Sequence, residues 1–176
     1  MASPEDVILD KQVIVNRSES SLYKAWRDFE NIPQILDFVD NVYVLDETRS
    51  RWTVRVANNE KEIWDTEIIA EDSHKMFSWH SQGNTDCLHE GTVRFSPGPE
   101  RGTVVRLQLR FFFPPGHDMS PDMLGSGLDD RVTQGLERFR LAMEADEFPM
   151  KRDNKTTLPE EYGPIDDRKR PFETND

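Results

Sequence analysis

Residues 91–113, GTVRFSPGPERGTVVRLQLRFFF, decide the fold of this chain. Apolar and polar side chains alternate on both sides of a turn rich in proline and glycine, which is the pattern of two antiparallel strands joined by a hairpin. Side chains of a strand point alternately to its two faces. One face of the second strand is therefore wholly apolar, and it consists of Val105, Leu107, Leu109 and Phe111.

Working outward, five more alternating segments precede this hairpin. They are VILDKQVIVN (7–16), NVYVLDE (41–47), RWTVRVA (51–57), EIWDTEIIAE (62–71) and KMFSWHSQ (75–82). The short stretches between the later segments are rich in Asn, Gly, Asp and Pro and fit hairpin connections. The sequence therefore predicts a seven-stranded antiparallel sheet.

The region between the first two strands, SESSLYKAWRDFENIPQILDF (18–38), has helical periodicity. Leu22, Trp26 and Phe29 recur at helical spacing, and Ser18 or Ser20 can cap the first turn. Pro33 marks the start of a second short helix, which we expect to run to Phe38.

A long C-terminal helix is predicted within residues 128–148. Its apolar stripe, expected to face the sheet, consists of Leu128, Val132, Leu136, Phe139 and Met143. Ser126 and Asp129 resemble a capping box at its start. The fold class is therefore α+β, with a curved sheet wrapped around the last helix.

Composition limits the function. The chain has 176 residues and a formal net charge of -12, which suits one compact domain and disfavours nucleic acid as a partner. We expect a domain over 1–148 and a charged tail over 149–176 that is too polar to fold alone. A single cysteine, Cys87, and an acidic start without a secretory signal predict a cytoplasmic protein, and no apolar run is long enough for stable membrane insertion.

The alternation assigns each strand two faces. The predicted inner face gathers the large apolar side chains: Trp52, Val54, Val56, Trp64, Thr66, Ile68, Ala70, Phe77, Trp79, Gly91, Val93 and Phe95, with Val105, Leu107, Leu109 and Phe111. The predicted outer face carries Thr53, Arg55, Asp65, Glu67, His80, Arg94, Arg106 and Arg110, with opposite signs on neighbouring strands. In the pair Trp79 and His80, the tryptophan is thus expected inside and the histidine outside.

The stretches LYKAWRDFENIPQILDFVDNVYVLDETRSRW, IWDTEI, FSWHS, EGTVRF and GTVVRLQLRFFFPPG resemble the polyketide cyclase/dehydrase branch of the START-like (helix-grip, SRPBCC) superfamily. The resemblance covers roughly Val7 to Phe148. It implies a seven-stranded sheet gripping a long C-terminal helix, with a cavity between them. Members include lipid and quinone carriers, hormone receptors and true cyclases. This chain departs from the pattern at CLHEG (87–91), so no residue role is carried over to His89 or Glu90.

Together these features predict that the protein binds a hydrophobic small molecule, such as a lipid, a quinone or an aromatic polyketide-like compound. The candidate ligand-binding residues are Trp64, Thr66, Phe77, Trp79, Phe95, Leu109, Phe111, Leu128, Val132 and Phe139. The loop PPGHDMSPDMLGSG (114–127) is a candidate gate. The alternative is that the same side chains only fill the core.

Other chemistry has less support. A cyclase or dehydratase needs an acid or base near its substrate, and the predicted inner face supplies none. A strand bulge that reversed the faces would bring in His80 and Glu67, and the rim offers Arg55, Tyr43, His117 and Asp118. Cys87 and His89 form a lone Cys-x-His, which is too few ligands for zinc. We expect no metal, no cofactor and no catalytic residue, and the sequence predicts no oligomeric state.

Overall fold

The structure, a computed structural model, describes residues 6–83, 87–114 and 121–149. Its strands are β1 (Val7–Val15), β2 (Val39–Val44), β3 (Arg49–Arg55), β4 (Lys61–Asp72), β5 (Met76–Gln82), β6 (Leu88–Pro97) and β7 (Thr103–Phe112). Its α-helices are α1 (Glu19–Arg27), α2 (Ile32–Ile35) and α3 (Leu128–Glu144). Short 3-10 turns are η1 (Phe29–Asn31), η2 (Ala57–Asn59), η3 (Pro99–Arg101) and η4 (Pro121–Leu124).

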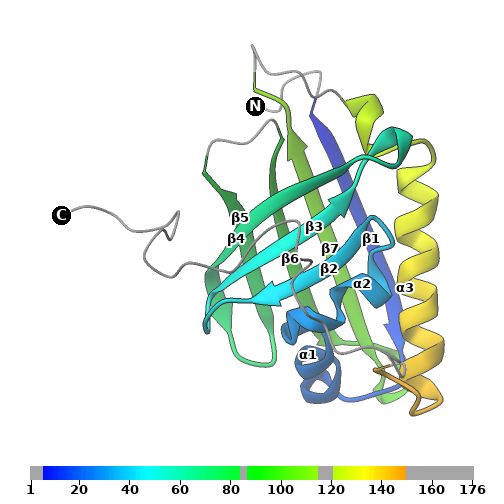
Figure 1. Cartoon of the computed structure of the whole chain (residues 1–176). Helices are drawn as coiled ribbons and strands as arrows, with labels where there is room; N and C mark the ends of the chain where they lie inside the picture. The colour runs from blue at the N-terminus through cyan, green and yellow to red at the C-terminus, as the bar shows by residue number, and fades with distance from the viewer. Residues whose placement is uncertain (1–5, 84–86, 115–120, 150–176) are drawn as a thin grey trace.

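The strands form one seven-stranded antiparallel sheet in the order β1-β7-β6-β5-β4-β3-β2. β2 to β7 follow one another as hairpins, and β1 pairs with β7, so β1 and β2 lie at opposite edges. The sheet is strongly curved, and α1, α2 and α3 cover its concave side and its β1 edge (Figure 1). The predicted α+β helix-grip architecture is confirmed.

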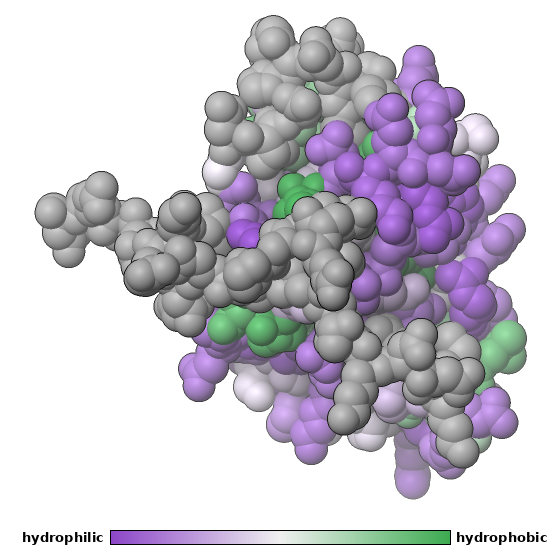
Figure 2. All heavy atoms as spheres, in the orientation of Figure 1, coloured by the Kyte–Doolittle hydropathy of each residue, from purple (hydrophilic) through white to green (hydrophobic). Residues whose placement is uncertain are grey.

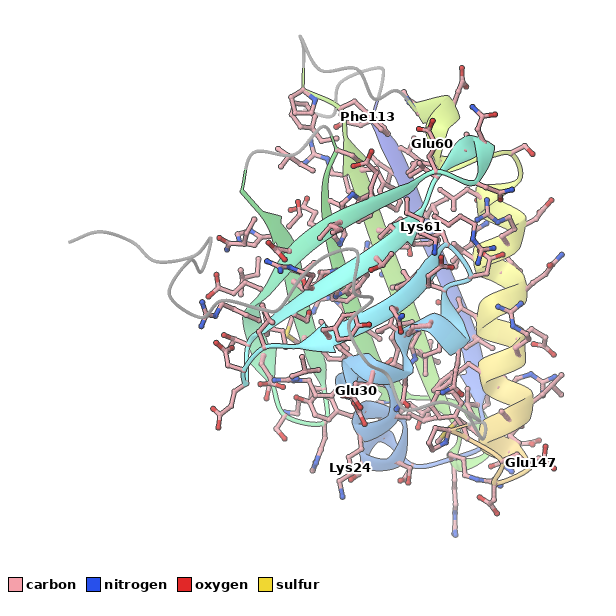
Figure 3. The ribbon with its side chains drawn as sticks, in the orientation of Figure 1. Lys24, Glu30, Glu60, Lys61, Phe113 and Glu147 are labelled. Atoms are coloured by element: carbon pink, nitrogen blue, oxygen red, sulfur yellow. The ribbon has the colours of Figure 1, made fainter. Side chains whose placement is uncertain are left out.

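The helices between β1 and β2 begin where the sequence indicates. Ser18 is the N-cap of α1, and its hydroxyl accepts a hydrogen bond of 3.2 Å from the Ser21 backbone nitrogen. The face of α1 toward the sheet buries Leu22, Tyr23 and Trp26, while the exposed Lys24 points away from the protein (Figure 3). α2 is shorter than predicted and ends at Ile35 rather than Phe38.

The start of α3 differs from the prediction. Its N-cap is Gly127, at φ 69°, and no side chain caps the helix. The capping box of Ser126 and Asp129 is therefore wrong, because the left-handed turn that glycine permits takes the cap position one residue later. The predicted stripe is otherwise confirmed: Leu128, Val132, Leu136 and Phe139 are buried, and Met143 is partly buried against the core.

α3 packs on β1 and on α2. Gly135 allows the second contact, because a Cβ at this position would lie 1.9 Å from the carbonyl oxygen of Ile35. The backbones of α2 and α3 thus approach each other directly. No helix within the described ranges is long and apolar enough to cross a membrane.

The inner face of the sheet forms the core, as the alternation predicts, with two corrections. Ala70 is exposed rather than buried, because a bulge between Ile68 and Ala70 shifts the register of β4 against β5. Thr53 lies on the outer face yet is only 4% exposed, since its cross-strand neighbours Asn41 and Ile63 flank it. Hydrophilic side chains cover most of the described surface seen in Figure 2.

Candidate functional site

An aromatic cluster occupies the concave side of the sheet. It consists of Phe29, Trp52, Trp64, Phe77, Trp79 and Phe111, each at most 4% exposed. Phe29 contributes contacts from η1 to three of the others, with ring centroids 5.8 Å from Trp52, 5.7 Å from Phe77 and 5.6 Å from Trp79. Edge-on and tilted ring packing of this kind stabilises beyond simple burial.

The structure buries every predicted ligand-binding residue and brings most of the rings together. Trp64, Phe77, Trp79 and Phe111 belong to the aromatic cluster, and Phe95 contacts its Phe77 at 6.3 Å. Leu109, Leu128 and Val132 are apolar core residues. Phe139 stands apart in its ring contacts, which are with Trp26 at 5.7 Å and Phe148 at 5.2 Å.

Thr66, the one polar residue of the predicted set, belongs to a hydrogen-bonded group. Its hydroxyl lies 2.7 Å from the hydroxyl of Ser50, which also accepts a hydrogen bond of 2.9 Å from the Trp52 indole nitrogen. All three side chains are almost completely buried. The hydroxyls of Ser50 and Thr66 are thus engaged with each other within the protein.

A pocket of about 410 Å³ opens beside this group, and we name it the portal. Its lining includes the inner-face residues Ser50 and Ile68, the cluster residue Phe29, and a charged rim with Arg27 and Asp46. Arg27 is held over the Phe29 ring at 6.0 Å by its hydrogen bonds to Glu71 and to the Glu47 backbone oxygen. The portal is therefore bounded on one side by the aromatic cluster.

His89 is the functional candidate that the sequence reasoning missed. It is 4% exposed and lies among the rings of the aromatic cluster, 4.6 Å from Trp64, 5.3 Å from Trp52 and 6.2 Å from Phe111. The signal was present, because His89 has the same strand parity as the inward Gly91, Val93 and Phe95. The statement that the inner face lacks an acid or base is thus wrong.

The hydrogen bonds of His89 define its state. The indole nitrogen of Trp79 donates to Nε2 at 3.2 Å, so Nε2 is unprotonated and the neutral ring carries its proton on Nδ1. Burial among the rings lowers the pKa of His89 to about 3, and the nearby His80 adds to this effect. The Nδ1 atom is buried and has no hydrogen-bond partner. An unpartnered buried donor costs about 1 to 3 kcal/mol.

The indole nitrogen of Trp26 is a second buried donor without a partner. Trp26 is fully buried on α1 and packs on Phe139 of α3. Both orphan donors thus belong to side chains of the core beneath the helices.

The outer face carries the other ionisable groups. His80 pairs across the sheet with Glu67 on one side and Glu90 on the other, and the side-chain amide of Gln82 lies 2.6 Å from Glu67 and 2.8 Å from His80. The bulge in β4 follows Glu67, so it does not turn Glu67 or His80 inward. His80, Glu90 and Arg110 line a second pocket of about 260 Å³, whose lining also includes Ser81 and His89.

The predicted ladder of opposite charges is only partly present. Glu67 and His80 are paired, but Arg94 lies directly opposite Arg106, a like-charged neighbour. The nearest acidic partners of the β7 arginines come from the start of the chain: Asp10 is 2.6 Å from Arg106 and Asp6 is 2.8 Å from Arg110. Arg110 also pairs across the sheet with Glu90 at 3.4 Å. The sequence did not indicate the ion pairs with Asp6 and Asp10, because it did not predict that β1 pairs with β7.

The remaining described candidates do not belong to the aromatic cluster. Arg55 is exposed and pairs with Asp40, while Tyr43 is 8% exposed at the β2 edge. His117, Asp118 and most of the candidate gate and tail lie outside the described residues. Cys87 is fully buried, and the described part of the chain holds no group of three His, Cys, Asp or Glu residues that could bind a metal ion.

Comparison with solved structures supports this architecture. A protein from Deinococcus radiodurans is similar at 27% identity and a TM-score of 0.67, covering 80% of this chain and 99% of that one. A START superfamily protein from Mycobacterium smegmatis has 16% identity and a TM-score of 0.57, covering 79% and 95%. The Zhui aromatase/cyclase from Streptomyces sp. R1128 has 16% identity and a TM-score of 0.60, covering 80% and 93%.

The last two likenesses show the helix-grip fold alone. At the sequence level, the profile of the family described as Polyketide cyclase / dehydrase and lipid transport matches residues 15–140, which is more than half of the chain. The chain therefore belongs to the Polyketide cyclase / dehydrase and lipid transport family.

Proposed function

We propose that the protein binds or carries a hydrophobic small molecule, such as a lipid, a quinone or an aromatic polyketide-like compound, on the concave side of its sheet. The family supports small-ligand binding in general. The finer assignment rests on the portal, whose volume of about 410 Å³ falls in the range of about 300 to 1,000 Å³ typical of ligand sites.

The position of the portal carries the proposal. Phe29, Ser50 and Ile68 link the portal lining to the inner face of the sheet. Phe29 in turn contacts Trp52 and Trp79, so an apolar ligand seated in the portal meets the aromatic cluster directly. Burial of such a ligand removes apolar surface from water. Each Å² of apolar surface buried contributes about 25 cal/mol of favourable free energy, which is the driving force for binding.

Binding without chemistry fits the ionisable groups of the site. Glu67 and His80 belong to the outer face, and the inward His89 has its pKa lowered to about 3 by burial. A general base works best when its pKa lies near the working pH, and His89 is far below it. His89 can still donate a hydrogen bond.

The test is to identify what the purified protein contains. Native mass spectrometry, followed by solvent extraction, is expected to reveal an apolar compound bound at one per chain. Ile68→Arg places a charge in the portal and is expected to abolish this binding. Ile69→Arg is the matched control, because Ile69 is 52% exposed and lines a different, outer-face pocket. A protein that is always empty and binds no apolar dye contradicts the proposal.

A cyclase- or dehydratase-type enzyme is the second candidate, favoured by the imidazole of His89 on the inner face and by the fold shared with an aromatase/cyclase. In that case His89→Gln abolishes turnover of a polyketide-like substrate, whereas His80, Glu67 and Arg55 can be replaced without loss. Unchanged product formation by the His89→Gln variant would exclude a catalytic role for His89 and with it this second candidate function.

The partner we propose is the ligand alone, in the cytoplasm. A net charge of -12 repels nucleic acid phosphates.

A further inference from the structure

The Arg27 side chain bridges two parts of the portal lining. One part is the end of α1 with η1, which contributes Arg27 and Phe29, and the other is the turn between β2 and β3, which contributes Glu47. The Nη2 atom of Arg27 donates a hydrogen bond of 2.8 Å to the backbone oxygen of Glu47. The same guanidinium lies 6.0 Å from the centroid of the Phe29 ring, which is only 4% exposed. A molecule that reaches Phe29 through the portal therefore has to pass Arg27.

A second anchor of Arg27 lies on Glu71 of β4, which does not belong to the portal lining. The Nε atom of Arg27 donates a hydrogen bond of 2.6 Å to Oε2 of Glu71, and the Tyr23 hydroxyl donates to the same oxygen. Burial and the charge of Glu71 raise the pKa of Tyr23 to about 12, so Tyr23 keeps its proton at neutral pH. Because a hydrogen bond between two charged groups is stronger than one to a neutral carbonyl, the bond to Glu47 breaks first.

Breaking the bond to Glu47 leaves the surrounding structure intact. The Arg27 side chain is 27% exposed, so water can take the place of the lost acceptor, and partly exposed charged groups of this kind contribute little to stability. The turn does not depend on Arg27, because Asp46 accepts hydrogen bonds from the backbone nitrogens of Thr48 and Arg49. Arg27 can thus leave Glu47 while it stays paired with Glu71.

We propose that Arg27 is a crossbar over the portal, and that breaking its hydrogen bond to Glu47 sets the rate at which an apolar ligand enters and leaves. This inference rests on the proposed ligand-binding function and names the residue that regulates access to the same site. The crossbar forms again over the bound ligand. It therefore acts on the rates of exchange and not on affinity, because a contact that is the same in the free and the bound protein does not shift the equilibrium.

Stopped-flow mixing with the neutral apolar dye N-phenyl-1-naphthylamine measures both rates. Arg27→Met keeps an unbranched side chain and removes the hydrogen bonds. It is expected to raise the association and dissociation rate constants about tenfold each, and to leave Kd within about twofold. Glu71→Gln weakens the anchor outside the portal and is expected to raise both rates about threefold. The double variant should be no faster than Arg27→Met, since both changes act through the crossbar.

Arg51→Met is the matched control. Arg51 is 24% exposed, close to the value for Arg27, and its Nε atom lies 2.7 Å from Asp65. This pair joins β3 to β4 outside the portal lining. Arg51→Met is expected to change neither rate, although it removes the same kind of ion pair.

A measurement without ligand tests the crossbar on its own. Acrylamide quenches tryptophan fluorescence on contact, and the rings of Trp52 and Trp79 lie 5.8 Å and 5.6 Å from Phe29. Because opening at Arg27 uncovers Phe29, Arg27→Met is expected to raise the quenching constant at least about twofold. Arg51→Met is expected to leave it unchanged.

The outcomes separate the two proposals. If the dye binds and Arg27→Met exchanges it at the wild-type rates, the crossbar is wrong and ligand binding stands. If Arg27→Met lowers affinity without faster association, Arg27 is a ligand contact and the crossbar is again overturned. If the dye does not bind the wild type, the proposed function fails, and equal quenching of the wild type and Arg27→Met then refutes the crossbar as well. Glu71→Gln carries the test where Arg27→Met does not fold.

Discussion

The indole ring of Trp79 lies directly over Gly91, its cross-strand partner, and a Cβ on Gly91 would stand 2.2 Å from ring atom Cζ2. Glycine is thus required at this position by the ring and not by a turn. Because Trp79 is fully buried in the aromatic cluster, its ring has no free space into which to move.

Gly91→Ala is therefore expected to lower the free energy of unfolding by about 2 kcal/mol or more, as overpacked cores typically lose 1 to 3 kcal/mol. Urea unfolding measures the change. Gly98→Ala is the control: Gly98 lies in the exposed turn before β7, its Cβ contacts would begin at 3.3 Å, and its φ of -115° suits any residue. Equal losses in the two variants would contradict this explanation.

Trp79→Ala and His80→Ala compare the two faces of β5. Truncation of the fully buried Trp79 is expected to cost about 3 to 5 kcal/mol, and truncation of the outward His80 well under about 1 kcal/mol. Thermal and urea unfolding both report these values. A larger loss at His80 than at Trp79 would mean that the two faces of the strand have been exchanged.

The free energy of unfolding should depend on pH through the ionisation of His89. Burial lowers its pKa to about 3, whereas an unfolded chain has a histidine pKa of about 6.5. Below pH 6.5 the unfolded chain binds a proton that the folded protein excludes, so this contribution to stability is complete above about 6.5 and is lost as the pH falls toward 3. The slope is up to about 1.4 kcal/mol per pH unit.

His89→Gln is therefore expected to reduce the slope of the unfolding free energy against pH by about this amount between pH 4 and pH 6. Denaturant titrations of the wild type and the variant at matched pH values measure the difference. Carboxylates contribute equally to both proteins and cancel. Parallel pH curves would show that His89 takes up its proton with the fold intact.

The thiol of Cys87 should react very slowly in the folded protein. Its side chain is fully buried, and burial, with the nearby charge of Glu62, raises the pKa of the thiol to about 12. Because the thiolate is the reactive form, a disulfide reagent at pH 8 is expected to react at least about a hundredfold more slowly than in denaturant. Since the chain has one cysteine, the signal is unambiguous. Rapid modification under native conditions would show that this end of β6 opens.

Much of the sheet could be predicted because the alternation of apolar and polar residues shows which face of each strand is buried. In RWTVRVA and KMFSWHSQ the bulky side chains share one parity, and Trp52, Phe77 and Trp79 are each at most 1% exposed. His89 was predictable by the same rule from Gly91 and Val93. The departure from the family pattern at CLHEG (87–91) leaves this alternation unchanged.

Other features depend on geometry that the sequence pattern does not contain. The bulge that exposes Ala70 lies in a strand whose sequence alternates in the ordinary way, so the sequence does not reveal it. The cap of α3 depends on the left-handed backbone conformation of Gly127. The portal depends on where η1 places Phe29, whose ring contacts Trp52 of β3 and Trp79 of β5, elements far from it in the chain. The pairing of β1 with β7, and with it the acidic partners of Arg106 and Arg110, has the same origin.

That pairing also shapes how the protein is made. Val7 meets Phe111 roughly 100 residues later, whereas β2 to β7 each find the next strand across a short turn. On the ribosome, the nascent β1 has no partner until β7 has emerged, so the hairpins form first and the opening strand docks near the end of synthesis. The residue that begins the sheet is among the last to join it.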